Sequence, residues 1–107
     1  MIRHVSVFTL KPDADVAAIA KAADLIRDRV PGARAIAYGP DAGLRPGNGG
    51  FAFSVDFDDE AAYRAWDTHP EHERIRRELI APYLAGVQRC QFRLWQAASR
   101  ADRPERG

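Results

Sequence analysis

Bulky apolar residues alternate with smaller or polar residues in four short stretches of the chain, and this period of two predicts β-strands. The stretches are Ile2–Leu10, Ala33–Gly39, Phe51–Phe57 and Gly86–Trp95. The first stretch has apolar side chains on both faces, so we expect it to be covered on both sides and to lie centrally in a sheet. The glycine-rich segment 40–50 between the second and third stretches predicts a flexible loop.

Two intervals between the strands show helical spacing instead. Apolar residues recur every three or four positions from Asp15 to Val30, and Asp13 or Asp15 could cap the start of this segment. The chain after Asp58 shows similar spacing, with a break at His69-Pro70 and an end before Pro82. We therefore predict one long helix followed later by a pair of shorter helices.

The predicted order is strand, helix, strand, strand, helix pair, strand. Such a chain forms an α+β fold in which a four-stranded antiparallel sheet has its helices on one face, the split βαβ or ferredoxin-like arrangement. The small side chains of Ala33, Ala35 and Ala37 predict that a helix packs on their side of the second strand. The opposite face of the sheet then holds Phe8, Ile36, Tyr38, Phe53 and Val55 beside His4 and Ser6.

A face of this kind, left exposed, would form a larger apolar patch than a monomer tolerates. Packing two such sheets face to face removes the patch. We therefore expect a homodimer, a dimeric α/β barrel whose two sheets enclose a shared interior. Arg89 and Gln91 of the last strand would add polar groups to that interior.

The length of 107 residues is that of one domain with one hydrophobic core. With 46% hydrophobic and 29% charged residues, the composition is that of an ordinary globular chain. We expect the folded domain to occupy residues 1–96 and the polar tail, residues 97–107, to be disordered.

The charge and the lack of long apolar segments argue against two classes of partner, nucleic acids and membranes. Sixteen Lys and Arg residues against fifteen Asp and Glu residues give a net charge of +1, which argues against nucleic acid as a partner. We expect no membrane association, because no long apolar run or leader-like segment is present.

The cysteine content indicates the cellular location. The single cysteine, Cys90, cannot form an internal disulfide, so we expect a cytoplasmic protein. We predict that Cys90 is a small hydrophobic residue facing the helices.

Five segments of the sequence resemble a known family. They are His4-Val5-Ser6-Val7-Phe8, Val30-Pro31-Gly32, Tyr38-Gly39-Pro40, Val55-Asp56-Phe57 and, as the most specific, His69-Pro70-Glu71-His72. Together they resemble the stress-responsive A/B barrel (Dabb) domain proteins over residues 2 to about 94. The resemblance implies a dimeric α+β barrel.

The resemblance implies little about activity, since most members of the family have no assigned reaction. One member is a plant polyketide cyclase, in which a histidine matching His72 is the catalytic base and a histidine matching His4 lines the pocket. Where that cyclase has an assisting tyrosine, this chain has Trp66. The replacement keeps an aromatic wall but removes a phenolic donor.

The histidines are the candidate catalytic residues. His72 shares a helix face with Ile75, Arg76 and Leu79, so we expect it to point inward, where it acts as an acid–base group or as a packing residue. His4 lies on the first strand beside Ser6, where it pairs with His72 or a ligand, or is a partly buried strand residue.

Seven further residues are candidates for binding a ligand, because ligand pockets are mostly apolar with a few polar groups. They are Phe8, Ile36, Tyr38, Phe53, Val55, Trp66 and Arg89. The aromatic residues among them are equally explained as core. Arg89 on an apolar strand face indicates a polar cavity or an anionic ligand, or else a solvated strand edge.

We predict no metal site and no cofactor. Glu71 and Glu73 flank His72 but point to other sides of a helix, which is unsuited to coordinating one ion. The leading hypothesis is a homodimeric protein that binds a small, largely apolar, oxygen-bearing ligand, with histidine-based, cyclase-like acid–base chemistry. The alternatives are a non-catalytic stress or scaffold protein with a filled barrel, and a cofactor-independent enzyme similar to monooxygenases.

Overall fold

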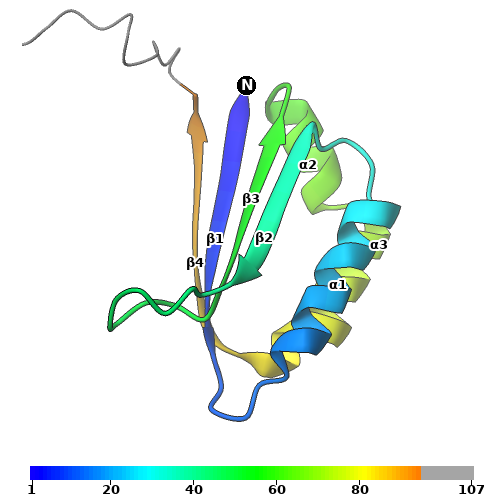
Figure 1. Ribbon diagram of the computed structural model, residues 1–107. Coiled ribbons are helices and arrows are strands. Elements are labelled where there is room, and N and C mark those ends of the chain that lie inside the picture. The colour runs from blue at the N-terminus through cyan, green and yellow to red at the C-terminus, as the bar shows by residue number, and fades with distance from the viewer. Residues whose placement is uncertain (95–107) are drawn as a thin grey trace, which may run out of the picture.

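The structure is a computed structural model that describes residues 1–94. Its elements follow the predicted order (Figure 1). They are β1 (Ile2–Leu10), α1 (Val16–Arg29), β2 (Ala35–Pro40), β3 (Phe51–Phe57), α2 (Glu60–Asp67), α3 (Pro70–Ile75) and β4 (Leu84–Arg93). After α3 the helix continues through a wider π-helical segment, Arg76–Ile80, and a short 3₁₀ turn, Ala81–Tyr83. Trp95 and the tail 97–107 lie outside the described residues.

The four strands form one antiparallel sheet with the order β2-β3-β1-β4. The central position predicted for β1 is thereby confirmed, and β2 and β4 are the edges. His4 of β1 lies opposite Gln91 of β4, and Ser6 lies opposite Arg89. Because opposite residues of an antiparallel pair point to the same face, these polar groups share one side of the sheet.

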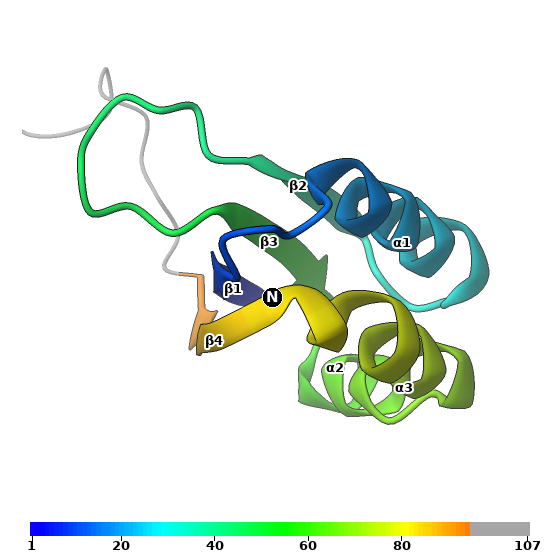
Figure 2. The ribbon, with the colours of Figure 1, turned by 90° about the horizontal axis from the view of Figure 1, so that it is seen from below.

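All three helices lie on one face of the sheet (Figures 1 and 2). The buried core between the two layers consists of Phe8, Ile19, Ala22, Ala23, Ile26, Val30, Phe51, Phe53, Val55, Phe57, Trp66, Ile75 and Ile80. The prediction that the bulky face of the sheet points away from the helices is therefore wrong. That face packs against the helices of its own chain.

The prediction failed because the small residues that fill the core come from the helix and not from the sheet. On α1 the buried residues include Ala22 and Ala23, so the helix comes close to the sheet, and large side chains of the sheet fill the remaining space. The alanines of β2, Ala35 and Ala37, are exposed on the face of the sheet away from the helices, which we call the open face. Tyr38 instead packs against the core.

The prediction for β4, that Cys90 faces the helices and Arg89 and Gln91 face away from them, is wrong in the same way. Cys90 is exposed and lies opposite Val5 of β1, on the face away from the helices. The two flanking residues, Arg89 and Gln91, therefore face the helix layer. The alternation along the strand was predicted correctly, and the side was not.

Capping residues fix where the two helices of the site begin. Oδ1 of Asp59 accepts a hydrogen bond of 2.8 Å from the backbone N–H of Ala62 and starts α2. Nδ1 of His69 accepts one of 3.1 Å from the backbone N–H of Glu71 and starts α3. These two short helices carry the polar residues that face the sheet.

The loop 41–50 projects from the sheet on the side opposite to the helices (Figure 2). The backbone N–H of Gly50 donates a 2.8 Å hydrogen bond to the carbonyl oxygen of Phe8 and ties the loop to β1. A Cβ at Gly49 would collide with Cγ1 of Val7, so this close approach requires glycine. Within residues 1–94 no helix has the length and apolar character needed to cross a bilayer.

Candidate active site

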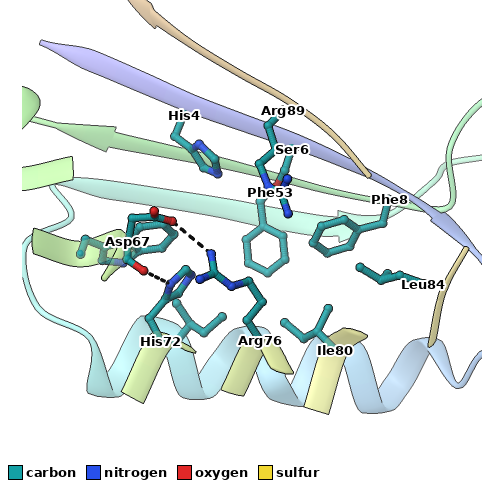
Figure 3. Close-up of a pocket in the computed structure, with 12 residues that line it drawn as sticks. His4, Ser6, Phe8, Phe53, Asp67, His72, Arg76, Ile80, Leu84 and Arg89 are labelled. Atoms are coloured by element: carbon teal, nitrogen blue, oxygen red, sulfur yellow. Dashed lines mark hydrogen bonds and ion pairs between the residues drawn. The ribbon is translucent and has the colours of Figure 1, made fainter. Parts of the chain in front are cut away.

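A cavity lies between the sheet and the helices of the single chain (Figure 3). Its polar lining consists of His4, Ser6, Asp67, His72, Arg76 and Arg89. Its apolar lining consists of Phe8, Ile26, Phe53, Trp66, Ile80 and Leu84. The space open to the centre of a water molecule is about 50 Å³. The cavity is therefore small and lies within one subunit, whereas the sequence had predicted an interior shared by two sheets.

The cavity brings together most of the residues singled out in the sequence. Both histidines line it, together with Phe8, Phe53, Trp66 and Arg89. Three predicted ligand-binding residues do not line it. Ile36 and Tyr38 are partly buried against the core, and Val55 is completely buried within it.

His72, at the start of α3, is 5% exposed, and one hydrogen bond defines the tautomer of its neutral ring. Its Nδ1 lies 3.1 Å from the backbone carbonyl oxygen of Asp67 (Figure 3). Because a carbonyl oxygen only accepts, Nδ1 must carry the proton. Burial lowers the pKa of His72, and the hydrogen bond to Asp67 opposes that shift only in part. In its neutral form, His72 therefore has an unprotonated Nε2 that can act as a base.

His4, on β1, is 6% exposed and has the opposite tautomer. Its Nδ1 lies 2.8 Å from the amide nitrogen of Gln91 on β4. An amide nitrogen only donates, so Nδ1 of His4 accepts and the neutral ring carries its proton on Nε2. Burial lowers the pKa of His4; the Asp67 carboxylate opposes this shift, and the Arg89 guanidinium adds to it.

The charged residues of the cavity do not balance. Nη1 of Arg76 lies 3.1 Å from Oδ1 of Asp67, so these two side chains form an ion pair. Arg89 forms no ion pair or side-chain hydrogen bond with any residue of the described part of the chain. With both histidines neutral, the lining has one positive charge in excess.

Trp66 of α2 connects the two histidines. Its ring centroid lies 4.1 Å from that of His72 and 5.8 Å from that of His4. The indole N–H is buried and makes no hydrogen bond within residues 1–94. An unpaired buried donor costs about 1–3 kcal/mol, so this group favours an acceptor atom beside it. The indole N–H of Trp66 is therefore an unpaired donor within the core.

Residues 2–92 match the profile of the stress responsive A/B barrel domain. The chain belongs to this family, abbreviated Dabb. None of the curated proteins matches the chain. Within the described residues of this Dabb protein, no group of three or more His, Cys, Asp or Glu side chains is placed to hold a metal ion.

Solved structures share the fold. A dimeric ferredoxin-like protein of unknown function from Thermobifida fusca is 32% identical, with a TM-score of 0.76 over 87% of this chain and 90% of that chain. A Dabb family protein with a ferredoxin-like fold from Mesorhizobium loti is 25% identical, with a TM-score of 0.69 over 88% and 96%. A hydroxynitrile lyase from Passiflora edulis is 14% identical, with a TM-score of 0.75 over 92% and 96%, and shows the fold alone.

Two polar residues of this Dabb cavity were missed as site residues in the sequence. Arg76 follows His72 by one helical turn and was expected on the same helix face, but it was not named as a site residue. Asp67 gave no sequence signal, because its partner Arg76 lies beyond the helix break at His69.

The two buried histidines make the stability of the Dabb domain depend on pH. In the unfolded chain they bind protons near the ordinary pKa of 6.5, whereas burial lowers both pKa values in the folded state. Between those values the unfolded state holds more protons, so the free energy of unfolding rises with pH. The free energy of unfolding therefore falls as the pH drops below 6.5, by up to about 1.4 kcal/mol per pH unit for each histidine.

Urea unfolding between pH 5 and pH 8 measures this dependence. The lowered carboxyl pKa values of Asp56 and Glu60 act only below the ordinary values of 3.8 and 4.5, outside this window. The double variant His4→Asn with His72→Asn should flatten the curve between pH 5 and 6.5. A wild-type protein equally stable at pH 5 and 6.5 would contradict the assignment of neutral, buried histidines.

Proposed function

We propose that this Dabb protein is an acid–base enzyme acting on a small, oxygen-bearing molecule held in the cavity of each subunit. The observation that supports the proposal is the complementary protonation of two histidines that line one cavity. His72 offers an unprotonated Nε2 and His4 offers an Nε2–H. A base and a hydrogen-bond donor at one site are the groups needed to remove a proton beside a carbonyl.

In this reaction Nε2 of His72 takes a proton from the carbon next to the carbonyl group. The electron pair of the broken C–H bond moves toward the carbonyl, and its oxygen becomes an enolate oxygen. The Nε2–H of His4 donates a hydrogen bond to that oxygen and stabilises it. His72 then returns the proton to carbon. The enolate is also the species from which a cyclase-like ring closure begins.

Burial of the two histidines supports this role. A lowered pKa keeps His72 neutral, and therefore able to accept a proton, at pH 7. His4 stays neutral for the same reason and donates its proton only as a hydrogen bond.

The cavity volume favours one alternative, a non-catalytic protein whose interior is filled by side chains. About 50 Å³ holds a few water molecules, whereas pockets for drug-sized ligands measure about 300–1,000 Å³. The acid–base proposal therefore requires a ligand of few non-hydrogen atoms, or movement of the partly exposed Arg76 and the exposed Arg89. The monooxygenase-like alternative rests on shared architecture, which carries no activity.

Deuterium exchange into 2-oxobutanoate tests the proposal. This small oxo acid loses its C3 proton signal in D₂O when a base removes and returns the proton. We expect an exchange rate that grows with protein concentration and falls in acid, with a midpoint below 6.5 because the pKa of His72 is lowered. Equal rates with and without the protein would contradict the proposal and favour the filled interior.

We also propose that the protein is a homodimer, now through the open face of the sheet. Val7 and Phe92 are large exposed hydrophobic residues on the strands of that face, and Leu44 is 89% exposed in the loop that projects on the same side (Figure 2). Covering such residues is the usual reason for a sheet to pair with a copy of itself. The relative from Thermobifida fusca is described as dimeric, which supports a dimer for this chain as well.

Val7→Asp tests this interface, because the new carboxylate would be buried without a partner in a face-to-face dimer. We expect the wild type to sediment as a dimer at micromolar concentration, and the dissociation constant to rise at least about 100-fold in the variant. Lys21→Asp on the exposed surface of α1 is the matched control and should remain dimeric. A folded wild-type monomer at micromolar concentration would contradict the proposal.

A reducing, cytoplasmic location remains part of the proposal. Cys90 is exposed and unpaired within the described residues. Exposed free thiols persist where the surroundings are reducing.

A further inference from the structure

The excess positive charge of the cavity is the feature that the acid–base proposal leaves unexplained. Asp67 is paired with Arg76 at 3.1 Å, which leaves Arg89 without a carboxylate in residues 1–94. Arg89 lies opposite Ser6 in the sheet, one position along the same face from the pair of His4 and Gln91. The register of β1 and β4 therefore places Arg89 next to His4 on the face of the sheet that lines the cavity.

The charged groups and the histidines lie at different depths. His4 and His72 are 6% and 5% exposed, whereas the Arg76 side chain is 37% exposed and Arg89 is exposed on the edge strand β4. The cavity thus runs from partly solvated guanidinium groups to buried imidazoles. A molecule with one charged end and one uncharged end would match this gradient, its charge near water and its reacting end among buried groups.

We propose that the ligand of this cavity is a small monocarboxylate, whose carboxylate binds Arg89 and whose other end lies against His4 and His72. A guanidinium group presents paired N–H donors that match the two oxygens of a carboxylate. One bound negative charge balances the one excess positive charge of the lining. The role of the uncharged end as the reacting end rests on the proposed acid–base function. The binding of the carboxylate depends only on Arg89.

A bound carboxylate has a measurable consequence beyond affinity. Its negative charge favours the protonated form of nearby imidazoles, so it raises the pKa of His4 and His72. His69 does not line the cavity and caps α3 instead, so its proton NMR signals at a fixed pH should not shift when propanoate binds. The chain has three histidines, and their proton NMR signals can be followed separately.

The experiment compares propanoate with propanamide, which has nearly the same shape and no charge, at equal ionic strength. We expect propanoate to raise the titration midpoints of His4 and His72 and to shift none of the His69 proton signals at a fixed pH, whereas propanamide should have no effect. Arg89→Gln should weaken propanoate binding at least about tenfold, the loss expected for a hydrogen bond to a charged group. Arg93→Gln is the matched control, because Arg93 is on the same strand, pairs with Glu60 and does not line the cavity.

Three results would overturn the anion site: equal binding of propanoate and propanamide, no binding of propanoate, or unchanged binding in Arg89→Gln. Inorganic phosphate is the competing anion, and tighter, Arg89-dependent binding of phosphate would overturn the carboxylate class. Failure of the acid–base function looks different. In that case propanoate still binds in an Arg89-dependent manner, while 2-oxobutanoate exchanges no deuterium.

Discussion

Replacing His72 by asparagine slows protein-dependent deuterium exchange into 2-oxobutanoate by about 10²–10⁴-fold, the contribution typical of a positioned general base. The substitution is chosen for its geometry. The amide nitrogen of asparagine takes the place of Nδ1 and can still donate to the carbonyl oxygen of Asp67, which lies 3.1 Å from Nδ1 in the wild type. What is lost is Nε2, the atom assigned to proton abstraction. The variant thus separates the catalytic atom from the structural one.

Proton NMR in D₂O measures the exchange rate, and far-UV circular dichroism confirms that the variant is folded. His69→Asn is the matched control, because asparagine preserves a side-chain acceptor at the start of α3 and His69 does not line the cavity. We expect its exchange rate to stay within about twofold of the wild type. A His72→Asn protein that exchanges deuterium at the wild-type rate would assign His72 to packing against Trp66.

The sequence predicts the elements of this fold well because the signals are local. The helix between Asp15 and Val30 appears as α1, with Asp15 as its cap and Val30 just beyond its end. The break at His69 separates α2 from α3, because its side chain and the proline that follows start a new helix. Capping, proline geometry and alternation all act within a few residues.

The side of the sheet that the helices cover depends on distant residues, and there the prediction is wrong. Alternation separates the two faces of β2 but cannot tell which one meets α1. That choice follows from volume, since a helix carrying Ala22 and Ala23 leaves space for the aromatic side of the sheet. The same applies to Cys90, whose side is set by its register with Val5.

The candidate site shows the same division. His4, His72 and Arg89 could be selected because each is a polar residue on an otherwise apolar face. The Asp67–Arg76 pair could not, because it joins two helices across a turn whose geometry the sequence does not define. The tautomers of the two histidines likewise depend on a carbonyl oxygen and an amide that only the folded chain brings to them.

Trp66→Ala lowers the free energy of unfolding by about 3–5 kcal/mol, the range observed when a buried aromatic residue is truncated to alanine. Trp66 is 3% exposed and packs against Phe57, His4 and His72, with ring centroids 5.2, 5.8 and 4.1 Å away. Its removal leaves a cavity where α2, α3 and the sheet meet. Domains of this size are stable by only about 5–15 kcal/mol, so the variant approaches the limit of folding.

Trp66→Phe distinguishes packing from hydrogen bonding at this position. Phenylalanine keeps an aromatic ring but lacks the indole N–H, which has no hydrogen-bond partner within residues 1–94. Because no protein hydrogen bond is lost, we expect this variant to lose less than half the stability lost by Trp66→Ala. Urea unfolding followed by circular dichroism measures both, with Lys21→Ala on exposed α1 expected within about 0.5 kcal/mol of the wild type. If Trp66→Phe proves as destabilising as Trp66→Ala, the indole N–H must have a hydrogen-bond acceptor in the folded protein, which would contradict its assignment as an unpaired donor.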